Sequence, residues 1–229
     1  MSNTRNPNEI QKPDKGPVLK VLVKGTNPSE GICGHVSAVS KHGKEKTVTS
    51  FEPSTLGMLN IFSIPVPGAN ATDPKEDKKQ ADYIFKKQLS PEEYRRVVNH
   101  QKELEKKIEK KEVLYSFMGE NGFSRFMASF LHHSPSIARK STMAHRKNLG
   151  FDPTVGDHFA EVSVAEDDHH NIPEPKLENC VSTVYSVVDT LFGGNSKIPK
   201  PNALTTPTEF AQMLEKTGEF KVKTRSNKS

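Results

Sequence analysis

Residues 178–194 read ENCVSTVYSVVDTLFGG, and this stretch constrains the fold more than any other part of the chain. Four of its apolar residues recur at helical spacing: Val184, Val187, Val188 and Leu191. Cys180 lies one turn earlier on the same stripe. Gly193-Gly194 predicts the end of the helix, because glycine adopts the left-handed cap conformation without a Cβ penalty. We therefore expect Cys180 in the first turn of a helix of about three turns.

This position supports two interpretations of the Cys180 thiol. Unpaired N–H groups and the helix macrodipole favour an anion at a helix N-terminus, so a thiol there ionises more readily. Free cysteine is also a common core residue, in which case the thiol has a structural role only. The helical pattern alone does not choose between them.

The composition argues against a nucleic-acid-binding protein and against a membrane-spanning one. The chain has 229 residues, enough for one domain with tails, and its 33% hydrophobic content and mean hydropathy of -0.67 predict that part of it is disordered. Its 33 basic and 28 acidic residues give a net charge of +5 without a dense basic stripe along the sequence, so we expect no nucleic-acid partner. No apolar run is long enough to span a membrane, and no standard export signal is present.

Turn and strand signals divide the first third of the chain. Residues 1–17 contain three prolines and predict a flexible leader, and 18–23 predict a strand. Residues 34–53, GHVSAVSKHGKEKTVTSFEP, predict a hairpin. Most of 54–81 is expected to be loop, and residues 81–87 (ADYIFKK) suit another strand.

The remainder is expected to be mainly helical or irregular. Ser90-Pro91-Glu92-Glu93 is a strong helix start, and apolar spacing extends that helix to about residue 111. Residues 113–131 predict a second helix interrupted by glycines, and 134–176 read as irregular. Residues 196–229 predict a linker, one short helix and a polar tail.

A catalytic thiol needs a base, and His35 has the most suggestive setting among the nine histidines. It opens a predicted strand directly after Gly34, where the missing side chain lets another element approach closely. If His42-Gly43 forms a two-residue loop, His35 lies opposite Ser50, with Glu52 as its diagonal neighbour. Without other information, the residues favour the alternative that His35 is a half-buried strand residue without a chemical role.

Taken together, these pieces resemble the circularly permuted papain-like (NlpC-like) thiol amidases, a group broadly related to lecithin retinol acyltransferase, with members among bacterial secreted effectors. The first matching motif is Gly34-His35 opening a strand, followed by a strand that ends in Ser50-Phe51-Glu52-Pro53. The second is Asn179-Cys180 beginning a helix that ends in Gly193-Gly194. Glu52 stands where the family usually has a second aromatic residue.

The resemblance implies Cys180 as nucleophile, His35 as general base and Ser50 as the third polar group, with Glu52 as its substitute. It implies an α+β fold in which an antiparallel sheet packs against the cysteine-bearing helix. The corresponding domain is 18–195, and residues 113–176 form a helical insertion in it. No cofactor is implied, and no metal site is expected, because no CxxC or HExxH is present.

The expected function is therefore a thiol hydrolase that acts on a peptide, amide or lipid-ester bond through an acyl-enzyme. The alternatives are a thiol acyltransferase, an inactive scaffold or partner-binding effector on the same fold, and a small α+β domain without an active site. Two cysteines fit a reducing compartment, so we expect a cytoplasmic fold. The resemblance adds secretion into a host cell, with a host protein as partner.

Overall fold

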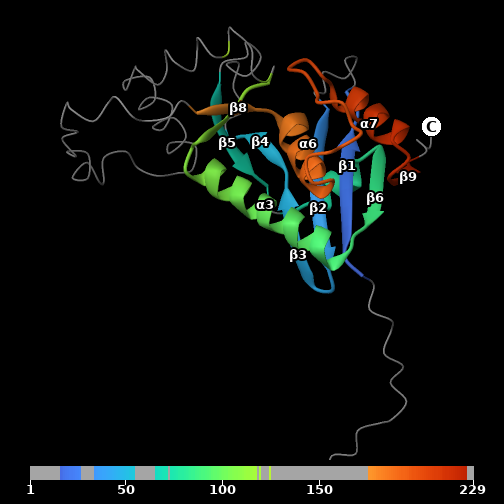
Figure 1. Ribbon diagram of the computed structural model, residues 1–229. Coiled ribbons are helices and arrows are strands. Elements are labelled where there is room, and N and C mark those ends of the chain that lie inside the picture. Colours follow the sequence, from blue (N-terminus) through green and yellow to red (C-terminus); the bar gives the residue numbers. More distant parts are fainter. Residues whose placement is uncertain are drawn as a thin grey trace, which may run out of the picture.

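The computed structural model describes residues 16–26, 34–54, 65–71, 73–117, 119, 124 and 175–225. These residues form an α+β fold with two sheets (Figure 1). The larger sheet is antiparallel, with strand order β3-β2-β1-β6-β9. Its strands are β1 (Val18–Lys24), β2 (His35–His42), β3 (Glu45–Thr49), β6 (Tyr83–Gln88) and β9 (Lys221–Thr224).

The smaller sheet extends beside the β2–β3 hairpin, because the chain continues from β3 through Ser50 directly into β4. Its strand order is β4-β5-β7-β8, with β7 and β8 parallel. Its strands are β4 (Phe51–Pro53), β5 (Val66–Asn70), β7 (Val113–Tyr115) and β8 (Lys176–Glu178). Gly68 of β5 packs against the Phe51 ring so closely that a Cβ there would lie 2.0 Å from it.

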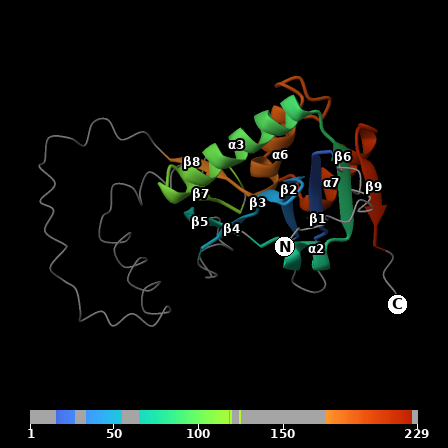
Figure 2. The same ribbon diagram turned by 90° about the horizontal axis from the view of Figure 1, so that it is seen from below.

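The helices α2 (Lys75–Gln80), α3 (Pro91–Glu109), α6 (Cys180–Leu191) and α7 (Pro207–Lys216) complete the described fold. The main core joins α6 and α7 to one face of the large sheet, where Leu19, Val21 and Val23 of β1 are fully buried. The short helix α2 lies on the other face, as Figure 2 shows. Within the described part of the chain, no helix is long and apolar enough to cross a membrane.

Local sequence explains where the long helices begin and end. Ser90, Asn179 and Thr206 each form a capping box with the residue three positions later. Gly193 and Gly194 have φ angles of 67° and 79°, so the glycine stop expected after the Cys180 helix is confirmed. The helix expected from Ser90 is likewise confirmed as α3.

Two expectations about the elements are wrong. The hairpin turn is Gly43-Lys44, since His42 pairs with Glu45, which moves the register by two residues. Residues 113–115, expected to begin a helix, form a strand because they pair with β5 and β8. The region expected to be mostly loop, 54–81, contains β5 and α2, and residues 55–64 of it lie outside the described residues. These elements form by pairing with segments that are distant in sequence, and local sequence patterns do not predict such pairing.

The C-terminal region is more ordered than its composition predicts. The short helix expected there is present as α7, and it buries Phe210, Ala211 and Leu214 in the main core. Residues 221–224 of the predicted tail form β9, which pairs with β6. Most of the predicted leader, Cys33, and the irregular region up to residue 174 lie outside the described residues.

Candidate functional site

Cys180 is the first residue of α6, and its position is held by the helix cap. The Asn179 side-chain oxygen accepts a hydrogen bond from the Ser182 N–H at 2.8 Å, and the Ser182 hydroxyl accepts one from the Asn179 N–H at 2.9 Å. Cys180 itself is only 5% exposed and packs in the main core. The cap and the core together leave the thiol little freedom to move.

Burial controls the protonation of this thiol. Loss of solvation raises the pKa of Cys180 from 9.0 to about 11, while the backbone N–H groups of Val36 and Val181 oppose the shift. Contact with the Val36 N–H also places the thiol beside the first residues of β2. At neutral pH Cys180 is therefore a neutral thiol, and it needs a base to become a nucleophile.

His35 is the first residue of β2, and the residue before it, Gly34, packs closely against the backbone at the end of β1. A Cβ at Gly34 would lie 2.6 Å from the carbonyl oxygen of Lys24 and 2.8 Å from the backbone nitrogen of Thr26. Only glycine allows the end of β1 to pass so near. The expectation that another element approaches this glycine is confirmed.

His35 begins a chain of hydrogen bonds that ends at a carboxylate. Its Nε2 lies 2.8 Å from the Ser50 Oγ, and the Ser50 hydroxyl donates to Asp77 Oδ2 at 2.9 Å. Because the Ser50 proton points to Asp77, the Ser50 oxygen accepts from Nε2–H. The neutral imidazole then carries its lone pair on Nδ1, the nitrogen free to accept a proton.

Two acidic side chains tune this imidazole. Glu52 Oε1 and Asp77 Oδ2 lie 3.7 and 3.9 Å from His35 Nε2. Burial lowers the pKa of His35 below its ordinary value of 6.5, and the two carboxylates oppose that shift. His35 is accordingly neutral at pH 7, as a general base must be, and its protonated form has two negative neighbours.

The same three side chains could hold a divalent cation. One ligand atom each from His35, Glu52 and Asp77 lies within 4.8 Å of the others. An imidazole with two carboxylates suits zinc or manganese. Such an ion would replace Ser50 at Nε2, and the proton of the neutral imidazole would then lie on Nδ1.

Asp77 is the site residue that sequence reasoning missed. It lies in α2, in a stretch expected to be loop, and is 27 positions from Ser50. A local signal was available: proline at the N-cap position, followed by acidic residues in the first turn, is typical of a helix start. That signal indicates a helix but not its contact with Ser50.

A small cavity opens beside the thiol. Its volume is about 140 Å³, and among the described residues that line it none carries a charge at neutral pH. Phe117 and Leu204 contribute to its wall although they are 44% and 65% exposed. A second cavity of about 210 Å³ lies on the imidazole side, and its charged lining consists of Glu52, Glu76 and Asp77 together with Lys24. The site is thus apolar beside the thiol, and carboxylates outnumber cations beside the imidazole.

The structure brings together His35, Ser50 and Glu52 as the sequence proposed, although by a different register. With the turn at Gly43-Lys44, continuation of the ladder places Glu52 opposite His35 and makes Ser50 the diagonal neighbour. Ser50 nevertheless makes the hydrogen bond. The thiol of Cys180 lies against the adjoining backbone at Val36.

The described residues thus define an α+β protein with a buried thiol, an imidazole and two carboxylates at one end of a hairpin. Comparison of the chain with protein-family models, with curated proteins and with solved structures found no match.

Proposed function

We propose that this protein is a thiol hydrolase of permuted papain-like arrangement, with Cys180 as nucleophile and His35 as general base. The observation that carries the proposal is the hydrogen-bonded chain from His35 through Ser50 to Asp77. It orients an imidazole at the start of β2, where the next residue contacts the thiol through its N–H. A base oriented by a third polar group is the usual requirement of a cysteine nucleophile.

The chemistry begins from a neutral thiol and a neutral imidazole. His35 Nδ1 takes the thiol proton as the Cys180 sulfur attacks the substrate carbonyl, which gives a tetrahedral intermediate. Collapse forms the acyl-enzyme, and the imidazolium returns its proton to the leaving group. Water, deprotonated by His35, then attacks the acyl-enzyme and releases the acid and the free thiol.

The site can stabilise both charges that develop during the reaction, the positive imidazolium and the negative oxyanion. Asp77, acting through Ser50, and Glu52 stabilise the imidazolium. The first N–H groups of α6 have no partner within the helix and point toward the region of the thiol, where the oxyanion forms. One such donor typically contributes about 3 kcal/mol to the transition state.

The cavity beside Cys180 indicates an uncharged, apolar acyl group. An apolar cavity of about 150 Å³ accommodates a benzene molecule, so 140 Å³ corresponds to an acyl chain of roughly six carbons. A charged acyl group would lose its hydration there without gaining a partner.

The first test is the pH dependence of Cys180 alkylation, followed residue by residue in the unmodified chain and in His35→Ala. We expect loss of His35 to reduce the rate at pH 7 by at least about tenfold, since general-base assistance typically contributes 10²–10⁴-fold. His100→Ala is the matched control, because its Nε2 also lies 3.0 Å from a serine oxygen, that of Ser186, which is six positions beyond Cys180 in α6. Equal rates in all three proteins, rising only at alkaline pH, would contradict the proposal.

One observation favours a second candidate, an inactive scaffold on the same fold. Cys180 is 5% exposed, which is typical of a structural thiol. Hydrolysis of p-nitrophenyl hexanoate separates the two candidates, because a scaffold releases p-nitrophenol no faster than the Cys180→Ala variant.

A further inference from the structure

Lysines that are far apart in sequence form a row across the large sheet. The strand register places Lys86 of β6 directly opposite Lys20 of β1 and also opposite Lys221 of β9. Directly opposed residues point to the same face of a sheet, and neighbouring strands are about 4.8 Å apart. Lys41 of β2 joins the same face, because it is opposite Val18, two residues from Lys20.

These four lysines line one hollow, which we call the lysine hollow. Its volume is about 1040 Å³, and its charged lining also includes Lys87 and Glu219. Lys87 and Glu219 form an ion pair at 2.8 Å, so they neutralise each other. Among the described residues, the ammonium groups of Lys20, Lys41, Lys86 and Lys221 have neither an ion-pair nor a hydrogen-bond partner.

The arrangement is electrostatically unfavourable in the free protein. Like charges directly opposite each other on neighbouring strands destabilise a sheet. Burial lowers the pKa of Lys20, and so do the positive charges of Lys78, Lys86 and Lys41. A bound anion removes this repulsion.

We propose that the lysine hollow binds a soluble molecule that carries two or more neighbouring phosphate groups. Ammonium groups on several strands can surround tetrahedral phosphates from different directions, and each contributes a compact charge. At about 1040 Å³, the hollow is slightly larger than the usual range for small-molecule sites, about 300–1,000 Å³.

The lining argues against two other anionic partners. None of the described residues that line the hollow is aromatic, so they offer no platform for stacking the bases of a single-stranded nucleic acid. The exposed large hydrophobic residues of the described chain do not line it either, so it lacks an anchor for a membrane. In addition, α2 stands on the same face of the sheet, with its Lys78 near Lys20, and obstructs a flat bilayer (Figure 2).

The test measures thermal unfolding of the full chain with sodium tripolyphosphate as the probe. At a hundredfold excess over Kd we expect Tm to rise by roughly 5–10 °C. In the double variant Lys20→Gln/Lys86→Gln we expect at least about tenfold weaker binding of the probe. The same variant should unfold at a higher temperature than the unmodified chain when no anion is present, because the opposed charges are gone.

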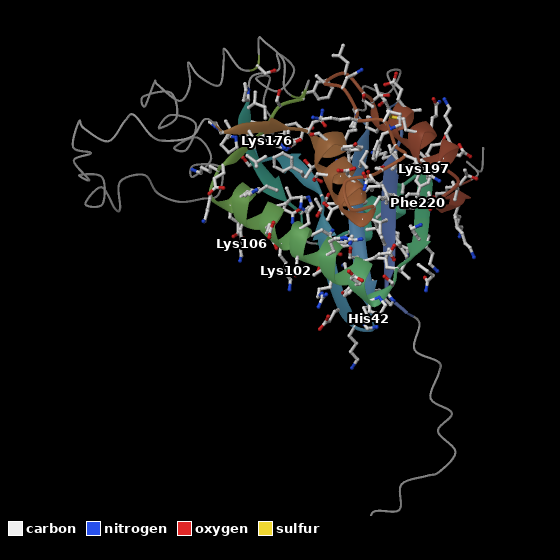
Figure 3. All side chains as sticks on the ribbon, viewed as in Figure 1. His42, Lys102, Lys106, Lys176, Lys197 and Phe220 are labelled. Atoms are coloured by element: carbon white, nitrogen blue, oxygen red, sulfur yellow. The ribbon has the colours of Figure 1, made fainter. Side chains whose placement is uncertain are left out.

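The matched control is Lys102→Gln/Lys106→Gln, which removes the same charge from the exposed side of α3 (Figure 3). It should retain the full response to tripolyphosphate. Equal loss of binding in both double variants would show that the probe responds to net charge only and would overturn the site. Absence of any Tm response in the unmodified chain would overturn it as well.

Two further experiments test whether the phosphate groups belong to a lipid surface or to a nucleic acid. Vesicles of phosphatidylcholine with phosphatidylserine should not sediment the protein, and a duplex DNA oligonucleotide should not compete with tripolyphosphate. Vesicle binding without a response to tripolyphosphate would assign the lysines to a membrane instead, and stronger binding of DNA would assign them to nucleic acid. None of these measurements uses Cys180, so their outcome is independent of the proposed hydrolase activity.

Discussion

Asp77 acts on the site through one hydroxyl group. Its Oδ2 accepts a hydrogen bond from the Ser50 hydroxyl, and this bond determines which imidazole nitrogen of His35 is free to accept a proton. Cys180 depends on its surroundings in the same way, since burial keeps its thiol protonated. At the scale of single residues, protonation therefore follows from neighbours that are remote in sequence.

Asp77→Asn tests the role of the carboxylate as a positioning residue. The amide oxygen can still accept from Ser50, but the negative charge that favours the imidazolium is lost. The pKa of His35 should therefore fall further, so the acidic limb of the pH–rate profile moves to lower pH. We expect kcat for p-nitrophenyl hexanoate to drop about tenfold with KM unchanged, because general-base efficiency follows basicity.

The control for Asp77 is Glu76→Gln, which removes the same charge from the adjacent position in α2 and from the same cavity. Its kcat should stay within about twofold of the unmodified chain, since Glu76 makes no hydrogen bond to Ser50. Equal losses in the two variants would indicate a general effect of charge rather than the Ser50 contact.

The raised pKa of Cys180 predicts a loss of stability at alkaline pH. A thiol with a folded pKa of about 11 and an ordinary value of 9.0 contributes stability that is complete below pH 9 and is lost as pH rises toward 11. The difference corresponds to about 3 kcal/mol. Urea unfolding of the unmodified chain and of Cys180→Ala should give curves that run parallel below pH 8 and converge by pH 11. Parallel curves throughout would mean that folding does not raise the pKa of the thiol.

At the scale of elements, α6 is the helix that presents the thiol, and both of its ends are fixed. Asn179 caps the N-terminus, and Arg96 of α3 reaches the C-terminus. The Arg96 guanidinium donates to the carbonyl oxygens of Thr190 and Leu191, each at 3.0 Å. A cation at this end also complements the helix macrodipole.

Arg96→Ala should lower the free energy of unfolding by about 1–2 kcal/mol, because two terminal carbonyls of α6 lose a charged donor. Urea denaturation measures the change. Arg95→Ala is the control on the same exposed side of α3, and we expect less than about 0.5 kcal/mol from it. If Arg95→Ala destabilises as much as Arg96→Ala, the contact with α6 is not the cause.

Element by element, local signals predicted the helices better than the strands. Ser90 and Asn179 identify the starts of α3 and α6 because a cap is a contact within four residues. The hairpin turn is at Gly43-Lys44, one residue later than predicted, and this difference shifts the strand register by two residues. The even shift preserved the face, so Ser50 remained beside His35.

At the scale of the whole molecule, the C-terminal segment belongs to the main core. Phe210 and Leu214 of α7 are fully buried together with residues of β1 and α6. The cavity beside Cys180 also takes part of its wall from Leu204 and Pro207. The predicted short helix therefore contributes to the main core, and the predicted linker before it contributes to the wall of the cavity.

Phe210→Ala should destabilise the whole described fold by about 3–5 kcal/mol, because it leaves a cavity in the shared core. Unfolding followed by circular dichroism should remain a single transition at a lower denaturant concentration. Leu204→Ala is the control, since that side chain is 65% exposed, and its effect should be below about 0.5 kcal/mol. Two separate transitions in the unmodified chain would show that α7 folds apart from the sheet.

Local patterns were enough to predict the α6 helix with its glycine stop and the capped start of α3, because caps and helical spacing are contacts within a few positions. Cys180, His35 and Ser50 were chosen as candidate site residues from the family resemblance, and their catalytic roles remain a proposal. The hydrogen bond between Asp77 and Ser50 and the row of Lys20, Lys86 and Lys221 became visible in the three-dimensional fold and could not be predicted from local patterns. The physical reason is that both arise from packing between elements separated by tens of residues, where strand order rather than sequence distance sets which charges meet.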